Sequence, residues 1–256
     1  MPLRVAYAAD RDIGVWVLDY LLERGCVPAA LLVSAPGRAS HAGELEARVP
    51  QLAGRVFRGT EFRTPATLEV LRALELDYIV GVHFPYVFPP EALRLPRVGV
   101  LNLHPALLPY NRGWHTASWA ILDGTPAGAT LHFMNEGVDT GDIVHQREQA
   151  VSPADTADTL YQRLKRLELE VFKEGWAMIE AGTVRRTPQP PQGGSTHRRE
   201  DLLRDEVRRI DPGAMVRAGD LLRRLRALST NAPAEAAFVE LDGVRYGVQI
   251  TLHQEP

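Results

Sequence analysis

The sequence predicts an α/β protein in which helices flank a mostly parallel sheet, with a small α+β appendage at the C-terminal end. Three observations support this fold class. Short apolar runs alternate with segments of helical spacing within residues 1–184, a stretch rich in proline and glycine follows at 185–196, and residues 197–256 combine a helical segment with a hairpin signal. Alternating strands and helices favour a parallel sheet because each helix returns the chain to the start of the next strand.

The first strand and helix are the most clearly marked elements. Residues 3–9 form an apolar run, after which Val15, Leu18 and Leu22 recur at helical spacing until Gly25 ends the segment. The same strand signature appears at 29–33, 77–82, 98–103, 129–134 and 143–150. The same helix signature appears at 65–74, along the amphipathic segment between 153 and 182, and at 218–228.

This order of elements predicts a Rossmann-like sheet, whose ligands bind at the carboxyl ends of the strands. The strand at 98–103 delivers Asn102 and His104 to that edge. The glycine-rich turn at 135–142 joins the next two predicted strands and contains Asp139. The sequence thus predicts that the functional site is carried by the stretch from 102 to 139.

Composition and charge exclude several classes of protein. With 256 residues and 45% apolar side chains, the chain can bury a full core. A formal net charge of −3 provides no general attraction to nucleic acid. Cys26 is the sole cysteine, so neither an internal disulfide nor a thiolate zinc cluster can form, and a reducing compartment is expected. Because no segment has the pattern of a signal peptide or a membrane span, we expect a cytoplasmic protein without a membrane partner.

Three motifs carry the strongest functional signal. They are NLHPALLP at 102–109, NRG at 111–113 and NEGVDTGD at 135–142. In order, spacing and strand context, they resemble the N-x-H-x-S-L-L-P element and the later D-x-G loop of the formyltransferases that use 10-formyltetrahydrofolate. The resemblance extends over residues 1–180 and implies a one-carbon group transferase. Ala106 departs from it, because the family usually has a serine there, and the sequence does not tell what the missing hydroxyl group changes.

The resemblance implies that Asn102, His104 and Asp139 are catalytic. Formyl transfer to an amine places charge on the formyl oxygen, which an amide donor such as Asn102 and an imidazole such as His104 can stabilise. The amine must also lose a proton, and a carboxylate such as Asp139 can orient the histidine and accept that proton through water. Taken singly, each residue fits a structural role in a turn or at a strand end, so the prediction depends on the three together.

The resemblance also implies 10-formyltetrahydrofolate as the formyl donor, and no metal. It assigns the pterin ring to the segment after the strand at 77–82, to the 135–142 turn and to a leucine of the first motif. The residues are Phe84, Pro85, Tyr86, Val87, Leu107, Glu136, Gly137 and Val138. An apolar strand exit suits a flat heterocycle, but the aromatic residues fit ordinary core packing equally well.

Five histidines between residues 83 and 145 raise the hypothesis of a metal site. They are His83, His104, His115, His132 and His145. No pair has the HExxH spacing or a comparable ligand spacing, and no cysteine can help. We therefore expect no metal.

The substrate is expected to contact two loops. The loop after the first strand opens a helix at Asp10 and Arg11, a position suited to phosphate or sugar hydroxyl groups. The stretch that holds Arg112, Trp114 and His115 borders the expected acceptor pocket, although His115 also fits a structural role. Because the first loop lacks G-x-G-x-x-G, the sequence gives poor support to a nicotinamide dinucleotide.

Three acceptor amines fit the family resemblance: a nucleotide-linked amino sugar, an initiator aminoacyl-tRNA and a small phosphorylated amine of purine synthesis. Residues 185–226 contain 11 arginines against 6 acidic residues, an excess that fits either a phosphate-binding surface or a solvated helix face. The chain length and tail resemble sugar N-formyltransferases, which favours the amino sugar, for surface polysaccharide such as O-antigen or a related glycan. The alternatives are a methionyl-tRNA formyltransferase and a non-catalytic sugar-nucleotide binding module.

Composition predicts three parts of the chain. Residues 1–184 would form the formyltransferase catalytic domain, 185–196 a linker and 197–256 a small C-terminal region. An Asp242-Gly243 pair signals a hairpin turn in the third part. The resemblance implies a homodimer through these C-terminal strands, and nucleic acid is not an expected partner.

Overall fold

The structure is a computed structural model that describes residues 3–37, 41–190, 192–253 and 255. The chain divides into two compact units that interleave along the sequence. The N-terminal unit comprises residues 1–104, 130–146 and 168–189, and the C-terminal unit comprises 105–129, 147–167 and 190–256. The stretch predicted as a linker contributes to both units, with Pro191 outside the described residues, and the domain boundaries drawn from composition stay predictions.

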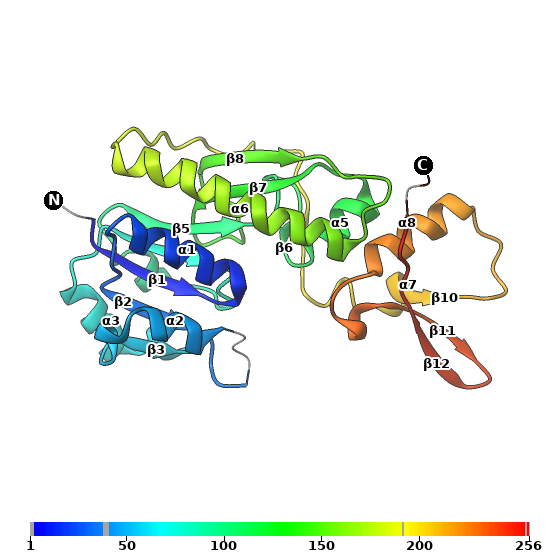
Figure 1. Ribbon diagram of the computed structural model, residues 1–256, viewed down its shortest axis with the longest axis horizontal. Coiled ribbons are helices and arrows are strands. Elements are labelled where there is room, and N and C mark those ends of the chain that lie inside the picture. Colours follow the sequence, from blue (N-terminus) through cyan, green and yellow to red (C-terminus); the bar gives the residue numbers. More distant parts are fainter. Residues whose placement is uncertain (1–2, 38–40, 191, 254, 256) are drawn as a thin grey trace. The chain divides into compact units, whose positions relative to one another are not determined.

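A seven-stranded sheet is the main element of the fold (Figure 1). Its strands lie in the order β3-β2-β1-β4-β5-β7-β8. Their bounds are β1 Val5–Ala9, β2 Ala30–Val33, β3 Val56–Arg58, β4 Tyr78–Val82, β5 Gly99–His104, β7 Ala127–Phe133 and β8 Ile143–Gln149. The strands from β3 to β5 pair in parallel, whereas β7 is antiparallel to β5. The predicted α/β fold with a mostly parallel sheet is confirmed.

Helices connect the parallel strands. Their bounds are α1 Arg11–Glu23, α2 Ala42–Arg48, α3 Pro65–Ala73 and α4 Pro90–Leu93, with short 3-10 turns at Pro50–Leu52 and Glu61–Arg63. The apolar periodicity predicts α1 and α3, whereas it does not predict α2 and α4. α3 begins after Thr64, whose side chain accepts a hydrogen bond from the Thr67 backbone N–H. α1 buries Ile13, Val17 and Leu18 on one side, which is the pattern of a helix packed against a sheet.

The 24-residue helix α6 (Ala157–Glu180) contributes large side chains to the core of the N-terminal unit. Phe172 and Trp176 are fully buried, and their rings stack with centroids 5.6 Å apart. Tyr20 meets Phe172 at 6.2 Å and Tyr78 meets Trp176 at 6.4 Å, both edge to face. Such aromatic pairs contribute about 0.5–1.5 kcal/mol each beyond their buried area. Among the described residues, no helix, α6 included, is long and apolar enough to cross a membrane.

The C-terminal unit combines short helices with two small sheets. The helices are α5 Thr116–Asp123, α7 Asp205–Arg208 and α8 Ala218–Leu228, with a 3-10 turn at Pro233–Glu235. One sheet has the order β10-β11-β12, with bounds Arg209–Ile210, Ala237–Leu241 and Val244–Val248, and the other pairs β6 Arg112–Gly113 with β9 Thr196–His197. Asp242 and Gly243 have positive φ angles of 52° and 78°, which suits a tight hairpin turn. The predicted α+β appendage is confirmed.

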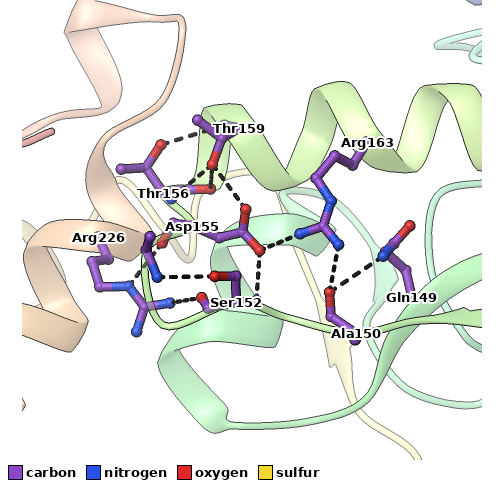
Figure 2. Close-up of polar contacts among 9 residues, drawn as sticks. Gln149, Ala150, Ser152, Asp155, Thr156, Thr159, Arg163 and Arg226 are labelled. Carbon is purple, nitrogen blue, oxygen red and sulfur yellow. Dashed lines mark hydrogen bonds and ion pairs between the residues drawn. The ribbon is translucent and has the colours of Figure 1, made fainter. Parts of the chain in front are cut away.

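Within the C-terminal unit, contacts around Asp155 join α8 to the loop before α6 (Figure 2). The Asp155 carboxylate accepts a hydrogen bond from the Ser152 N–H at 2.7 Å and pairs with the Arg163 guanidinium. Arg226 of α8 donates to the backbone carbonyl oxygens of Asp155 and Ser152, at 2.7 and 2.6 Å. Since Asp155 is buried, its charge needs such partners. Arg226 therefore acts as a structural tie within this unit.

Candidate active site

Strands β4, β5 and β7 align the polar residues of the first and third motifs. In register, Gly81 lies opposite Asn102, and Asn102 lies opposite His132. Asn102 and His104 are two residues apart on β5, so their side chains project from the same face of the sheet. A Cβ at Gly81 would lie 3.1 Å from the Leu101 carbonyl oxygen and 3.4 Å from Asn102 Oδ1. The glycine therefore keeps the space beside Asn102 open.

Asp139 lies at the centre of a cluster with Asn102, His104 and His132. Asn102 Nδ2 donates to Asp139 Oδ1 at 3.2 Å and lies 3.2 Å from His132 Nε2. Nε2 of His104 is 3.6 Å from Asp139 Oδ2, and Nε2 of His132 is 3.5 Å from Asp139 Oδ1. The structure thus brings together the three residues that the motifs predicted as catalytic. Their catalytic roles stay predictions.

His132 belongs to this cluster, although the motifs did not mark it as catalytic. Its Nδ1 lies 2.8 Å from the Phe133 carbonyl oxygen. Because a carbonyl oxygen only accepts, Nδ1 carries a hydrogen, and in the tautomer with Nδ1–H alone Nε2 can accept from Asn102. The His132 ring is fully buried and lies 6.3 Å from the His104 ring. The sequence marks His132 only as a residue of the predicted strand at 129–134. Its position opposite Asn102 follows from the register with β5, which the sequence does not give.

The loop between β7 and β8 holds Asp139 in the left-handed backbone region, with a φ of 50°. Asn135 Oδ1 accepts a hydrogen bond from the Gly137 N–H at 2.9 Å. Gln189 Nε2 lies 2.8 Å from the backbone carbonyl oxygens of both Asp139 and Gly141. A left-handed residue other than glycine is uncommon and needs support from its surroundings. Gln189 provides that support, and its position in a predicted linker gave no hint of it.

The predicted donor-binding segment 84–87 alternates between inward and outward side chains. Phe84 and Tyr86 are partly buried, with ring centroids 5.1 Å apart, and they contact Phe62 at 5.5 and 6.5 Å. Pro85 and Val87 are exposed, Val87 by 72%. Core packing therefore holds the two aromatic residues in place. The outward side of the segment is the surface that a ligand can reach.

The second predicted donor-binding segment, 136–138, is exposed in the same unit. Glu136 pairs with Arg94 at 3.3 Å, and Val138 is 53% exposed. A Cβ at Gly137 would lie 2.3 Å from the Thr140 hydroxyl oxygen, so the turn requires glycine there. Binding of the donor by this segment stays a prediction.

Asp10, predicted to contact the substrate, caps helix α1. It is buried, and its carboxylate accepts hydrogen bonds from the Arg11 N–H and the Ser34 hydroxyl, both at 2.8 Å. Arg11 is exposed and has a positive φ of 64°. The carboxylate thus has a structural function at the start of α1, and a contact of either residue with substrate stays a prediction.

Four predicted site residues lie in the C-terminal unit: Leu107, Arg112, Trp114 and His115. Leu107 packs beside Gly128, where an added Cβ would lie 3.0 Å from the Leu107 Cβ. Trp114 is partly exposed, and the Arg199 guanidinium lies 5.3 Å from its ring centroid. His115 Nε2 lies 3.2 Å from the Arg199 carbonyl oxygen. The structural role considered for His115 is thus supported by a contact. The donor-binding role of Leu107 and the substrate roles of Arg112, Trp114 and His115 stay predictions.

Each of the five histidines between residues 83 and 145 has a ring nitrogen within 4.0 Å of a carboxylate oxygen. The pairs are His83 with Glu168, His104 and His132 with Asp139, His115 with Glu235, and His145 with Glu174. Within the described part of the chain, no three His, Cys, Asp or Glu side chains are grouped as metal ligands.

The fold and this cluster define an α/β enzyme that gathers amide, imidazole and carboxylate groups on one face of its sheet, a set suited to acyl-type transfer. The chain belongs to the formyl transferase family, whose model, described as "Formyl transferase", matches residues 26–175. A second model, described as "N-formyltransferase dimerization C-terminal domain", matches residues 204–254. Formyl transfer is therefore the reaction class of this enzyme.

Known relatives that are similar to the chain act on two different acceptors. Methionyl-tRNA formyltransferase from Agathobacter rectalis is 30% identical over 253 residues, which cover 96% of this chain and 79% of the relative. The dTDP-4-amino-4,6-dideoxyglucose formyltransferase from Mycobacterium tuberculosis is 32% identical over 179 residues, which cover 70% of this chain and 74% of the relative. Sequence identity by itself does not separate the two acceptor classes.

Solved structures resemble the chain as well. A sugar N-formyltransferase from a Shewanella species is 20% identical, covers 99% of both chains and has a TM-score of 0.83, a likeness of fold. The formyltransferase PseJ from Anoxybacillus kamchatkensis, in complex with UDP-4,6-dideoxy-4-formamido-L-AltNAc and tetrahydrofolate, is 30% identical. The superposition covers 66% of this chain and 86% of the PseJ chain, with a TM-score of 0.52.

Substitution of Gly141 by alanine should disrupt the loop that carries Asp139. An added Cβ would stand 1.9 Å from the Phe133 carbonyl oxygen, and relief of such overpacking typically costs about 1–3 kcal/mol. We expect thermal unfolding to show a lower Tm for Gly141→Ala. The control is Gly43→Ala in α2, where a Cβ meets nothing within 4 Å and alanine favours the helix. Equal Tm values for Gly141→Ala and the parent protein would contradict the close packing of the loop.

Proposed function

We propose that this enzyme transfers the formyl group of 10-formyltetrahydrofolate to the amine of a nucleotide-linked amino sugar in the cytoplasm. The observation that carries the proposal is the contact of Asp139 with both Asn102 and His104, at 3.2 and 3.6 Å. The product would serve as a precursor of surface polysaccharide, such as O-antigen, or of a related glycan.

In the proposed mechanism, His104 stabilises the charge that develops on the formyl oxygen. Its Nε2 lies 3.6 Å from the Asp139 carboxylate, whose negative charge stabilises positive charge on the imidazole during transfer. The two side chains are only 7% and 14% exposed, so water screens their interaction weakly. Hydrogen bonds from a charged donor are about twice as strong as those between neutral groups. His104 is therefore suited to this role.

Asn102 would supply the second donor to the formyl oxygen. Its Nδ2 contacts with Asp139 and His132 are both 3.2 Å long, at the outer limit of the usual range. Catalytic hydrogen bonds often shorten only when the reacting groups are bound. The long contacts of Asn102 Nδ2 can therefore be replaced by a shorter hydrogen bond to the formyl oxygen. Asp139 would then accept the amine proton through water, as its position beside both donors allows. That proton would pass to the donor nitrogen as its bond to the formyl carbon breaks, so that tetrahydrofolate leaves.

The residues present fit a flat heterocyclic donor. The two predicted donor-binding segments each expose an apolar side chain, Val87 and Val138. Sites for small ligands are lined mainly by apolar side chains with a few polar groups, which is the composition of these two segments. The complex of PseJ with tetrahydrofolate also supports a folate donor. When bound, 10-formyltetrahydrofolate supplies the activated formyl group.

The arginines of residues 185–226 favour a small acceptor over tRNA. Eight of the eleven contact other parts of the chain: Arg186, Arg199, Arg204, Arg208, Arg209, Arg223, Arg224 and Arg226. Arg224, for example, donates to the backbone carbonyl oxygens of Val207, Glu206 and Arg209. A guanidinium held in this way is less available to nucleic-acid phosphates. The guanidinium groups that donate to backbone carbonyl oxygens, such as those of Arg224 and Arg226, thus support a small acceptor over tRNA.

A methionyl-tRNA formyltransferase is the second candidate. The observation that favours it is the 30% identity to the Agathobacter rectalis enzyme over 96% of this chain. The 32% identity to the dTDP-4-amino-4,6-dideoxyglucose formyltransferase and the 30% identity to PseJ, whose structure holds a UDP-linked sugar, support the amino sugar instead. A third reading, a sugar-nucleotide binding module without activity, is opposed by the complete Asn102, His104 and Asp139 set.

We also infer a homodimer through the C-terminal strands. β12 lies at the edge of its sheet, and Leu241, Val244 and Tyr246 of the hairpin are 47%, 50% and 51% exposed. An edge strand with exposed apolar residues is a template for pairing with another chain. The dimerization-domain match over residues 204–254 supports a second copy as that partner.

Substitution of Asn102 by alanine tests the catalytic assignment. Loss of one oxyanion donor typically lowers the rate about 100- to 1,000-fold, so formylated product measured by mass spectrometry should fall by that factor. Calorimetric binding of 5-formyltetrahydrofolate, a stable analogue of the donor, should change little. Asn231→Ala, at an exposed position, is the control. Unchanged turnover by Asn102→Ala would remove Asn102 from the catalytic set.

A panel of acceptors separates the candidate functions. Purified enzyme with 10-formyltetrahydrofolate is offered nucleotide-linked amino sugars and charged initiator tRNA, and the mass gain of one formyl group is measured. We expect formylation of at least one amino sugar and none of the tRNA, because the arginines are engaged within the chain. Formylation of tRNA alone would establish the second candidate, and binding of a sugar nucleotide without any turnover would favour the module.

Light scattering tests the dimer. We expect the mass of two chains for the parent protein and of one chain for Val244→Asp/Tyr246→Asp, because two carboxylates in an apolar interface cost free energy. Met215→Asp is the control, since Met215 is fully exposed and lies outside the C-terminal sheet. A stable monomer of the parent protein would rule out the proposed homodimer.

A further inference from the structure

A buried histidine–glutamate pair in the N-terminal unit has no part in the proposed mechanism. Glu168 of α6 is 0% exposed. Its two carboxylate oxygens lie 2.8 and 3.0 Å from Nε2 of His83, whose side chain is 7% exposed. A carboxylate in such a place is costly unless it is paired, and a pair of apolar side chains would often stabilise the fold equally well. The presence of this pair therefore calls for a reason other than stability.

His83 occupies the point where β4 ends. Val82, the last residue of β4, lies opposite Leu103, between Asn102 and His104 on β5. His83 follows with a positive φ of 50°, an uncommon backbone conformation for a residue with a side chain. The chain turns here out of the sheet and into the segment 84–87. The pair with Glu168 thus holds the chain at this turn.

The segment 84–87 has a second point of attachment beyond His83. The rings of Phe84 and Tyr86 pack against Phe62 in the core, which leaves the outward side of the segment at Pro85 and Val87. Two anchors, one polar and one aromatic, define the path of a short segment more closely than one. The polar anchor sets where this segment leaves the sheet.

We propose that the His83–Glu168 pair is a positioning device that sets the backbone of 84–87 for the formyl donor. The inference rests on the proposed function, in which this segment holds the donor beside Asn102 and His104. Neither His83 nor Glu168 needs to touch the donor. Their effect passes through the backbone that follows His83, so they are positioning residues.

A second His–Glu pair on the same helix provides a matched comparison. His145 of β8 and Glu174 of α6 lie 2.6 Å apart, with 23% and 42% of their side chains exposed. This pair has the same chemistry but is partly exposed to solvent, and it is not followed by a predicted donor-binding segment. Exposed pairs contribute little to stability. Substitutions there should leave donor binding unchanged.

The test measures calorimetric binding of 5-formyltetrahydrofolate to variants of the full chain. Glu168→Leu removes the carboxylate that faces His83 Nε2, and we expect about tenfold weaker binding or more, in line with the loss of a buried hydrogen bond to a charged group. Glu168→Gln keeps an oxygen that accepts from Nε2, and its affinity should stay within about threefold of the parent value. Glu174→Leu, the control, should bind as the parent protein does.

Kinetics and unfolding separate positioning from a structural role. We expect Glu168→Leu to raise KM for the donor while kcat at saturating donor and KM for the acceptor change little. Its Tm should fall as well, because His83 Nε2 loses its partner in a buried place. If this variant fails to fold, His83→Asn/Glu168→Gln serves instead, because asparagine tolerates a left-handed backbone. A lower Tm with unchanged donor affinity, or an equal rise of both KM values, would overturn the inference. Failure of the parent protein itself to bind the analogue would instead overturn the proposed function on which it rests.

Discussion

The antiparallel pairing of β5 with β7 is the constraint on which the candidate active site depends. It sets Asn102 opposite His132, and the loop after β7 then returns to this face with Asp139. A shift of one residue in this register would turn the side chains of one strand to the other face of the sheet. Gly81 on β4 completes the arrangement because it leaves space beside Asn102. Backbone hydrogen bonds thus place the polar side chains of the candidate site, and the side-chain contacts refine their positions.

The same unit shows how charged and polar groups are kept inside an apolar fold. His132 and Glu168 are fully buried, and each has a polar partner within hydrogen-bond distance. An unpaired buried polar group costs far more than the net gain from a paired one. Two buried histidines therefore have different structural roles. His132 contacts Asn102 and Asp139, whereas His83 lies at the turn after β4.

The C-terminal unit is stabilised by a small apolar cluster together with arginine contacts to the backbone. Its small apolar cluster of Leu202, Leu228 and Ala237 is supplemented by arginines that donate to backbone carbonyl oxygens, as Arg224 and Arg226 do. A small domain buries a small fraction of its surface, so such contacts matter more there than in a large core. Some of the arginines that give this region its local charge excess are thus engaged in contacts within the unit.

The sequence by itself determined the α/β class, most strands and helices, and the family, because apolar periodicity and the Asn102, His104 and Asp139 motifs are local patterns. It missed the short strand Val56–Arg58 and the helix Thr116–Asp123, which are too short to show a clear period. Only the tertiary structure decided that β7 is antiparallel, that His132 joins the cluster and that His83 meets Glu168, 85 residues away. Contacts of this kind depend on strand register and helix packing, and neither leaves a signal in neighbouring residues. The motif from 102 to 139 thus identified the reaction, and the fold supplied the partners that hold its residues in place.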